Sequence, residues 1–504
     1  MKRHLHLTSR LCLLGLVPFC WLAAQDEAAA SYGRKVATDP DGNVIVAGDT
    51  TEGMMRERIL ILKYSGAGVP LWTNRFGPPT NGIYKVSGLA VDNSGNVFVA
   101  GAGGGHYVTI AYSPAGVTLW TNRHDEPNNF NDAATALAVD HHGNVFVTGY
   151  SAFNGGPSFY TTIAYSGAGV ALWTNRYGPG GTAMAVDARG NVIITGSSYN
   201  GMSYDYATVA YSGAGVALWT NRYDAGSYTD DFTSAIAVDR NGNVFVTGYS
   251  GYACVTIAYS GAGVPFWTNR YDRPGFGEDL PRAVAVDHNG NVFITGHSKK
   301  PNLPTHPNPD ADYVTIAYSG AGAARWTNFH ALPGNNGYDS AYALAVDASG
   351  NVLVTGTSEA DFLTIKYSGT GVALWTNRFD GATNTADGAF GAAVDASGNV
   401  FVTGIAGPDC LTIAYSAAGA ALWTNRYTNP VLPRLAVQPL VAASSTVSLN
   451  LSGPTNAPWT IQRALTIAGP WTNLGPSLTG TNGSGTFLDA DPPPKGAFYR
   501  VAPP

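Results

Sequence analysis

One unit recurs eight times along this chain, and this repetition constrains the fold more than any other feature. Each copy contains approximately Ala-Val-Asp-x-x-Gly-Asn-Val-Phe-Val-Thr-Gly, followed by Thr-Ile-Ala-Tyr-Ser-Gly-Ala-Gly-Val-Ala-Leu-Trp-Thr-Asn-Arg. Successive copies of Gly-Asn-Val lie 47 to 60 residues apart. A period of this length is typical of a protein built from stacked supersecondary units. The eight Gly-Asn-Val segments begin at Gly42, Gly95, Gly143, Gly190, Gly242, Gly290, Gly350 and Gly398.

Each unit contains four segments rich in β-branched and aromatic residues, which are typical of strands. The first two are linked in the third unit by Asp-His-His-Gly, and the last two by Ser-Gly-Ala-Gly. Both links are short enough for tight hairpin turns. Each unit is therefore predicted to be a four-stranded antiparallel sheet. We call its strands A to D in chain order and expect them, in the third unit, at residues 134–139, 144–149, 160–165 and 170–177.

A sheet of this kind has two faces to bury, and radial stacking of successive sheets buries both. The sequence therefore predicts an all-β fold, an eight-bladed β-propeller of four-stranded antiparallel blades. The small residues of strand A suit the axis, and the Trp of strand D suits the rim. We expect this Trp, and the Arg that follows Trp-Thr-Asn in seven units, to make contacts between blades. Ring closure is left open, and the segment Pro433 to Gln438 is a candidate for a late strand A.

The ends of the chain differ from the repeats. Three basic residues, an apolar run at residues 11–22 and Ala23-Ala24 indicate a secretory signal peptide at residues 1–24. Residues 25–435 are assigned to the propeller. Residues 436–504 contain a few short strand-like segments between Pro-rich links, and we expect a small β-sandwich-like module there. We therefore predict a secreted protein that is extracellular, attached to the cell surface or periplasmic.

Composition excludes several classes of partner. Charged residues make up 12% of the chain, about half of the usual ~25%. The formal net charge is −6, and removal of the signal would lower it further, so nucleic acid is not an expected partner. No segment is long and apolar enough for a transmembrane span. We expect a monomer. Cys254 and Cys410 occupy the same place in two repeats and are expected to be buried, unpaired thiols.

The repeat resembles the bacterial β-propeller repeat called SBBP, which is related to NHL-type repeats. The resemblance rests on Ala-Val-Asp-x-x-Gly-Asn-Val-Phe-Val-Thr-Gly and Tyr-Val-Thr-Ile-Ala-Tyr-Ser and covers about residues 34–427. It implies a propeller and little about activity, and this chain has eight units where the family is named for seven. The Ala-Phe-Tyr-Arg-Val segment near the end is similar to C-terminal modules of secreted proteins from Verrucomicrobia-like bacteria. That similarity implies an extracellular location.

The variable loops are where a site is expected. In a propeller the A–B and C–D turns lie on one face and the B–C and D–A loops on the other. The turns are nearly identical in all units, whereas the loops vary, and variable loops on a rigid scaffold commonly carry binding. Further aromatics on this face are Tyr84, Tyr199 and Tyr204, and the sixth unit has a Pro-rich insertion. The candidate ligand-binding residues are Asp132, Asp231, Asp279, Asp339 and Asp387 before strand A, Asp205, Asp312, Asp361 and Asp409 before strand C, and Tyr228, Tyr252 and Tyr338 nearby.

These residues support more than one function. Carboxylates beside aromatic rings suit sugars, and carboxylates alone suit Ca²⁺. The competing and favoured interpretation is that each Asp caps its own loop by accepting backbone N–H bonds. We expect a non-catalytic binding protein for a glycan or a protein. The alternatives are a glycosidase or polysaccharide lyase on the same face and a purely structural or adhesive protein. No catalytic residue, metal ligand or cofactor is predicted, and Ca²⁺ is the one ion that the pattern suggests.

Overall fold

The computed structural model describes residues 30–51, 57–77, 83–125, 129–153, 159–178, 181–226, 229–275, 277–299, 311–331, 338–381 and 387–429, and six strands between residues 434 and 502. The predicted signal peptide and the Pro-rich insertion of the sixth unit lie outside the described residues. The chain divides into one compact unit spanning Glu27–Asn429 and another that contains the six C-terminal strands. In the described residues we find strands and turns, and none forms a helix that could cross a membrane.

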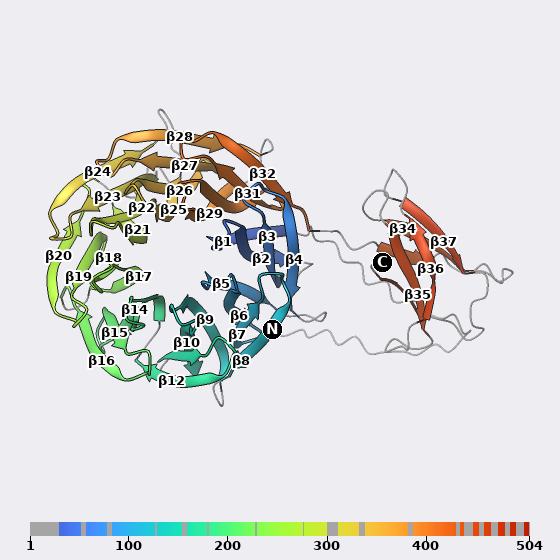
Figure 1. Ribbon diagram of the computed structural model, residues 1–504, viewed down its shortest axis with the longest axis horizontal. Helices are drawn as coiled ribbons and strands as arrows, with labels where there is room; N and C mark the ends of the chain where they lie inside the picture. The colour runs from blue at the N-terminus through green and yellow to red at the C-terminus, as the bar shows by residue number, and fades with distance from the viewer. Residues whose placement is uncertain are drawn as a thin grey trace, which may run out of the picture. The chain divides into compact units, whose positions relative to one another are not determined.

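The first unit is a ring of eight four-stranded antiparallel sheets, and each sheet is made from one repeat with its strands paired in chain order. Figure 1 shows β1, β5, β17, β21, β25 and β29 near the axis and β4, β8, β16, β20 and β28 on the circumference. The predicted eight-bladed propeller is therefore confirmed. Strands A to D of each repeat are consecutive β-strands.

Blades 1 to 4 consist of β1 (Ala30–Thr38), β2 (Val44–Thr51), β3 (Glu57–Tyr64), β4 (Pro70–Phe76), β5 (Tyr84–Val91), β6 (Val97–Gly103), β7 (His106–Tyr112), β8 (Thr118–His124), β9 (Asn129–Val139), β10 (Val145–Phe153), β11 (Phe159–Tyr165), β12 (Ala171–Tyr177), β13 (Gly181–Val186), β14 (Val192–Tyr199), β15 (Tyr204–Tyr211) and β16 (Ala217–Tyr223). Blades 5 to 8 consist of β17 (Asp231–Val238), β18 (Val244–Ser250), β19 (Ala253–Tyr259), β20 (Pro265–Tyr271), β21 (Glu278–Val286), β22 (Val292–Lys299), β23 (Ala311–Tyr318), β24 (Ala324–His330), β25 (Asp339–Val346), β26 (Val352–Ser358), β27 (Asp361–Tyr367), β28 (Ala373–Phe379), β29 (Asp387–Val394), β30 (Val400–Ala406), β31 (Asp409–Tyr415) and β32 (Ala421–Tyr427).

The Asp-x-x-Gly-Asn segment of each repeat forms the A–B turn. In blade 3, Asp140 Oδ1 accepts the backbone N–H of His142 at 2.9 Å and of Asn144 at 2.8 Å. Its Oδ2 accepts the Asn144 side-chain amide at 2.8 Å. Gly143 takes the left-handed conformation that the turn requires, with φ of 80°. The Asp side chain therefore caps the turn, and Gly is needed because its backbone readily adopts a positive φ.

The A–B and C–D turns lie side by side, as predicted. A Cβ added to Gly167 of the C–D turn in blade 3 would lie 3.1 Å from the carbonyl oxygen of Gly143 in the A–B turn. Gly213 and Gly190 of blade 4 have the same relation. Because alternate connections of a meander lie at opposite edges, the B–C and D–A loops share the other face.

A contact that we call the seam clamp joins each blade to the next. Between blades 4 and 5, the indole N–H of Trp219 donates to Gly261 O at 3.0 Å, and the Asn221 amide donates to Gly263 O at 2.7 Å. Gly263 has φ of 81°, and a Cβ there would lie 2.6 Å from the Trp219 ring. All eight seams have this clamp, so the predicted packing of Trp between blades is confirmed. The Trp residues are Trp72, Trp120, Trp173, Trp219, Trp267, Trp326, Trp375 and Trp423.

Blade 8 closes onto blade 1 with the same clamp. Trp423 donates to Gly66 O at 3.0 Å, and Asn425 donates to Gly68 O at 2.7 Å. Val44, Leu60 and other buried residues of blade 1 share one apolar cluster with Phe401 of blade 8. No blade is shared between the two ends of the ring. The expectation that residues 433–438 supply a late strand A is wrong, because β33 (Arg434–Val437) pairs with β34 (Val447–Ser452).

Strand A carries a one-residue bulge opposite the Gly of Val-Thr-Gly in strand B. In blade 5 the register shifts between Thr233 and Ala235, opposite Gly248. A Cβ on Gly248 would lie 2.1 Å from Phe232 O, so only glycine fits there. The residue skipped by the bulge has no partner in the ladder. These skipped residues are Arg34, Ser87, Thr135, Thr182, Ser234, Arg282, Tyr342 and Phe390.

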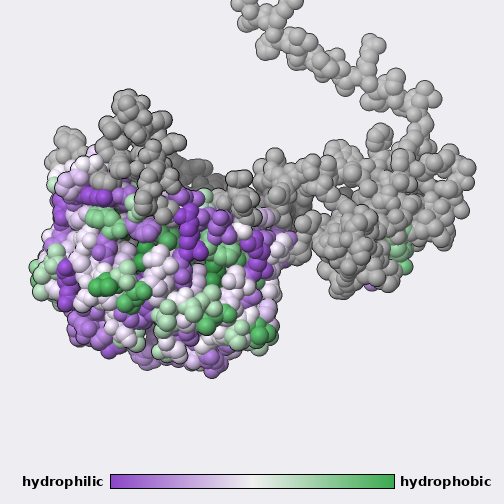
Figure 2. Space-filling view, turned by 90° about the horizontal axis from the view of Figure 1, so that it is seen from above, coloured by the Kyte–Doolittle hydropathy of each residue, from purple (hydrophilic) through white to green (hydrophobic). Residues whose placement is uncertain are grey.

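Strand D forms the outer wall, where alternate residues point outward. In blade 4, Leu218, Thr220 and Arg222 are exposed. Trp219 and Asn221 are partly buried and face the seam. Figure 2 shows apolar patches separated by hydrophilic ones over the side of the ring in view. Cys254 and Cys410 are buried, unpaired thiols, as expected. Burial raises the pKa of both thiols to about 12.

The C-terminal unit consists of two three-stranded antiparallel sheets. One sheet has the order β33-β34-β37 and the other β36-β35-β38. The structure has strands in this part of the chain, as expected from its strand-like segments. The remaining bounds are β35 (Pro458–Ala464), β36 (Thr472–Leu478), β37 (Ser484–Asp489) and β38 (Phe498–Ala502).

The seam clamp predicts that replacing Gly by Ala lowers the free energy of unfolding more under the Trp ring than at a turn that the ring does not cover. Gly263→Ala and Gly290→Ala both place Ala at a φ near 80°, and only the first meets atoms, at the base of the Trp219 side chain. We expect Gly263→Ala to lower the free energy of unfolding by at least about 2 kcal/mol more than Gly290→Ala. Urea unfolding of the two variants measures the difference. Equal losses would mean that Trp219 does not cover the turn in solution.

Closure predicts that the first and last blades are joined as firmly as any other pair. Asn425→Ala and Asn221→Ala each remove one amide-to-carbonyl hydrogen bond of the same length. We expect each to cost about 1 kcal/mol, with the two values alike. Thermal unfolding compares them. If Asn425→Ala had no effect while Asn221→Ala destabilised the ring, the seam between blades 8 and 1 would be open.

Candidate functional site

The carboxylates before strand A are buried, and those of Asp231, Asp279 and Asp387 bind the protein's own backbone. Asp231 accepts the Ala225 N–H at 2.8 Å, Asp279 the Arg273 N–H at 2.6 Å, and Asp387 the N–H groups of Gly381 and Gly407 at 2.6 and 2.9 Å. These acceptors cap the D–A loop six residues upstream. The five side chains are at most 3% exposed, and they are Asp132, Asp231, Asp279, Asp339 and Asp387.

Burial also changes the pKa of the carboxyl groups before strand A. It raises the pKa of the Asp231, Asp279 and Asp339 carboxyls, because the charged form loses its hydration. The Ser298 hydroxyl donates to Asp279 from the neighbouring strand and opposes that effect. The hydrogen bonds that Asp231, Asp279 and Asp387 accept from loop N–H groups are those that the capping interpretation predicts.

The carboxylates before strand C are paired with arginine. Asp205 accepts from Arg222 at 2.9 Å, Asp361 from Arg378 at 2.6 Å, and Asp409 from Arg426 at 3.1 Å. Each pair lies within one blade, so the expectation that these Arg residues bridge blades is wrong for them. The Cα of each Asp and Arg lie on adjacent strands C and D, which explains the pairing. Arg75 does cross a seam, because it donates to the Tyr427 hydroxyl at 2.8 Å.

Blade 6 lacks this Arg, and an Arg from the preceding loop takes its place. Phe329 stands where the other repeats have Arg, and Arg273 comes from the preceding D–A loop. The Arg273 guanidinium carbon lies 3.8 Å from the centroid of the Phe329 ring, and its Nη1 pairs with Asp312 at 2.6 Å. Asp312, the fourth of the carboxylates before strand C, is therefore also paired with an arginine.

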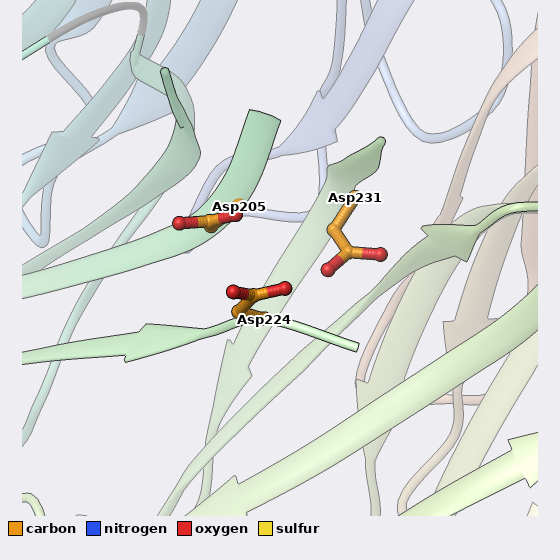
Figure 3. A group of neighbouring side chains, drawn as sticks. All are labelled: Asp205, Asp224 and Asp231. Carbon is orange, nitrogen blue, oxygen red and sulfur yellow. The ribbon is translucent and has the colours of Figure 1, made fainter. Parts of the chain in front are cut away.

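Among the described residues, two clusters of three carboxylates lie on this face, one between blades 4 and 5 and one between blades 7 and 8. Asp205, Asp224 and Asp231 each place one oxygen within 4.8 Å of the others (Figure 3). Asp361, Asp380 and Asp387 form the equivalent cluster. Asp224 and Asp380 were missed in the sequence, although each directly follows the aromatic residue that ends strand D.

Oxygen ligands of this kind suit a hard cation such as Ca²⁺. The Asp205 carboxylate, however, already binds protein donors, since Arg222 and the Asn200 amide contact it at 2.9 and 3.0 Å. Asp387 likewise accepts two backbone N–H groups. These hydrogen-bond donors thus already give the carboxylates much of the charge compensation that a bound cation would provide.

A line of four aromatic rings, which we call the aromatic track, crosses the seam between blades 4 and 5. Adjacent ring centroids are 5.2 Å apart from Tyr199 to Tyr204, 5.2 Å from Tyr204 to Phe232, and 5.3 Å from Phe232 to Tyr249. Tyr199 is 52% and Tyr204 38% exposed. Cross-strand pairing holds the first two together and the last two together. Phe232 and Tyr249 were not foreseen, because they resemble ordinary strand residues in the sequence.

The other predicted aromatics are placed differently. Tyr252 is exposed in the turn between β18 and β19, whereas Tyr84 is buried against Phe76. Tyr228 lies outside the described residues. Tyr338 is 43% exposed and lies beside Ala311, the first residue of β23.

His297 holds Tyr338 from below the surface. Its Nδ1 lies 2.9 Å from the Ser340 hydroxyl and its Nε2 lies 3.2 Å from the Tyr338 hydroxyl. Burial, with help from the positive charges of Arg282 and Lys299, lowers the pKa of His297 to about 4. A neutral imidazole between two hydroxyls satisfies every partner, because each hydroxyl can donate or accept.

Comparison with known proteins agrees with the fold. The family model described as Beta-propeller repeat, SBBP, matches residues 219–251, which run from Trp219 to Gly251, just after the end of β18. This match confirms the resemblance to the SBBP repeat. No curated protein matches the chain.

Solved structures similar to this chain have varied descriptions. Sqt1 from Chaetomium thermophilum has a TM-score of 0.47 and 11% identity, over 81% of this chain and 99% of that one. The periplasmic gluconolactonase PpgL of Pseudomonas aeruginosa has a TM-score of 0.43 and 12% identity, over 79% and 96%. The β-propeller domain of the Trilobed protease from Pyrococcus furiosus has a TM-score of 0.40 and 8% identity, over 70% and 96%. Likenesses this distant carry no inference about activity.

His297 predicts a specific dependence of stability on pH. Its pKa is lower in the folded protein than in the unfolded chain, so the unfolded chain takes up a proton first as the pH falls below about 6.5. Stability is therefore lost between about pH 6.5 and 4, by about 3 kcal/mol in total. We expect His297→Gln to remove this part of the pH dependence in urea unfolding. A variant whose profile parallels that of the wild type would show that His297 is accessible to protons in the fold.

Proposed function

We propose that this protein binds glycans, without cleaving them, on the face formed by the B–C and D–A loops. The observation that supports this is the aromatic track. Sugar rings present C–H groups on one side, and these pack favourably against the faces of aromatic rings. Tyr and Phe rings fixed by strand pairing lose little conformational freedom when a ligand binds, which favours affinity.

Polar groups adjoin the track, as sugar hydroxyls require. Asp230 accepts the backbone N–H of Tyr204 at 3.0 Å, and Asp224 is exposed beside it. Asn200 lies at the turn between Tyr199 and Tyr204 and holds Asp205. A few polar groups beside an apolar surface are the usual composition of a small-molecule site.

Burial of the carboxylates favours binding over catalysis. A glycosidase needs two carboxyl groups that both reach the scissile bond. Asp231 has no exposed surface and Asp205 is 3% exposed, so the described cluster offers one accessible carboxylate, Asp224. We therefore place the glycosidase or lyase second, and a purely structural or adhesive protein third.

We further propose that the protein acts outside the cell as a monomer. The predicted signal peptide at residues 1–24 supports export. Ca²⁺ is proposed as an optional ligand of the carboxylate clusters, so binding should be measured with and without it.

The test is a glycan array probed with residues 25–504, with and without Ca²⁺. We expect retention on a defined class of glycan and, for Tyr204→Ala, an affinity about tenfold lower, because a stacking surface is removed. Phe266→Ala is the matched control, since Phe266 is 48% exposed on the outer strand β20 and lies outside the track. No retained glycan, or an equal effect of the two substitutions, would refute the proposal. Release of shorter products would favour the enzyme.

A further inference from the structure

The most unusual charge on this face is Arg282. It is the residue skipped by the strand A bulge in blade 6, so it does not take part in the ladder, and it is exposed. The arginines nearby have partners, because Arg222 pairs with Asp205 and Arg273 with Asp312. Within the part of the chain that the structure describes, Arg282 has no carboxylate at ion-pair distance.

Arg282 lies near the residues that hold Tyr338. Leu280, two residues before Arg282 on β21, pairs with His297 of β22, and the His297 Nε2 lies 3.2 Å from the Tyr338 hydroxyl of blade 7. The positive charge of Arg282 also affects the acidity of His297, Tyr338 and Tyr249, and Tyr249 is the last ring of the aromatic track in blade 5. Among the described residues, Arg282 is thus an exposed cation without a carboxylate partner, next to the Tyr338 hydroxyl, and its remaining N–H groups are available to a ligand.

The nearby acidic groups are engaged elsewhere. Glu278, on the same strand, lies 3.5 Å from Lys299 Nζ. Asp230 caps Tyr204, and Asp339 is buried at the start of β25. Neither Glu278 nor Asp230 forms an ion pair with Arg282 among the described residues, so a ligand anion would meet little competition.

The Tyr338 hydroxyl adds a second donor. When His297 carries its proton on Nε2, it donates to the Tyr338 oxygen, and the Tyr338 O–H can donate to a ligand oxygen in exchange for its contact with the Ser340 hydroxyl. The Ser340 hydroxyl then donates to Nδ1, so no partner is lost. A guanidinium fork next to a hydroxyl donor suits the two oxygens of a carboxylate.

We propose that Arg282 and Tyr338 form a subsite for the carboxylate of an acidic sugar, so that the glycan bound by this face contains uronic acid residues. The inference rests on the proposed glycan-binding function. In this arrangement the aromatic track stacks sugar rings, and Arg282 selects the charged ones. His297 is a positioning residue that holds the Tyr338 hydroxyl.

The test compares ligands that differ only in charge. Oligogalacturonates and oligoalginates, together with their methyl esters, are titrated into residues 25–504. We expect at least one acid form to bind about tenfold more tightly than its ester, with the difference lost at high ionic strength. Arg282→Gln should abolish the preference and leave the affinity for the ester unchanged. Tyr204→Ala should weaken acid and ester alike.

Controls separate the possible failures. Arg240→Gln removes one exposed arginine from the A–B turn of blade 5, on the opposite face, and should not alter the preference. Equal affinity for acid and ester, or a loss of preference with Arg240→Gln as well, would overturn the inference. Binding of neutral glycans alone would overturn it and leave the proposed function standing. Binding of no glycan at all would refute both.

Discussion

Every seam of this ring depends on the closure of Trp-Thr-Asn over the C–D turn of the next blade. The indole and the Asn amide each bind a turn carbonyl, and the indole ring covers a left-handed Gly that has no room for a side chain. The receiving groups are backbone atoms, so the contact does not depend on which side chains the loops carry. The clamp lies at one face of the ring and leaves the loops of the other face free to vary. The uniform turns on one face and the variable loops on the other are therefore two results of the same contact.

The few charged residues of this chain mainly cap the turns and loops at the ends of strands. The Asp of each A–B turn accepts two backbone N–H groups, and the Asp before strand A caps its loop. In two blades a Lys replaces the Ala of Thr-Ile-Ala-Tyr, and both Lys side chains are buried. Lys63 pairs with Asp39 and donates to Pro114 O, the carbonyl that Trp72 also binds. A charge placed in this way reinforces the clamp and is unavailable to a ligand.

The sequence was sufficient for the propeller, because periodic Gly, Asp and Trp have direct physical causes in turns, caps and seams. It did not reveal ring closure, because the chain ends of blades 1 and 8 look like any other pair of repeats. It also suggested exposed carboxylates at positions such as Asp231, which the fold buries, because the pattern alone does not separate a loop cap from a ligand. The aromatic track was only half visible. Tyr199 and Tyr204 stand in a variable loop, whereas Phe232 and Tyr249 lie inside strands, and only the seam brings the four together.

Function in a ring of near-identical blades must come from positions that the clamp and the caps do not use. The residue after the strand B Gly is one such position, because it faces the next blade near the B–C and D–A loops. This residue differs between blades, since Tyr249 stands there in blade 5 and His297 in blade 6, whereas blade 4 has Ser197. The residue skipped by the strand A bulge is the other, and it supplies Arg282. Both positions are held by a backbone that repeats in every blade. A change of side chain there leaves the seam clamp in place, because the clamp uses other residues, so a specific site can arise on a scaffold whose repeats remain alike.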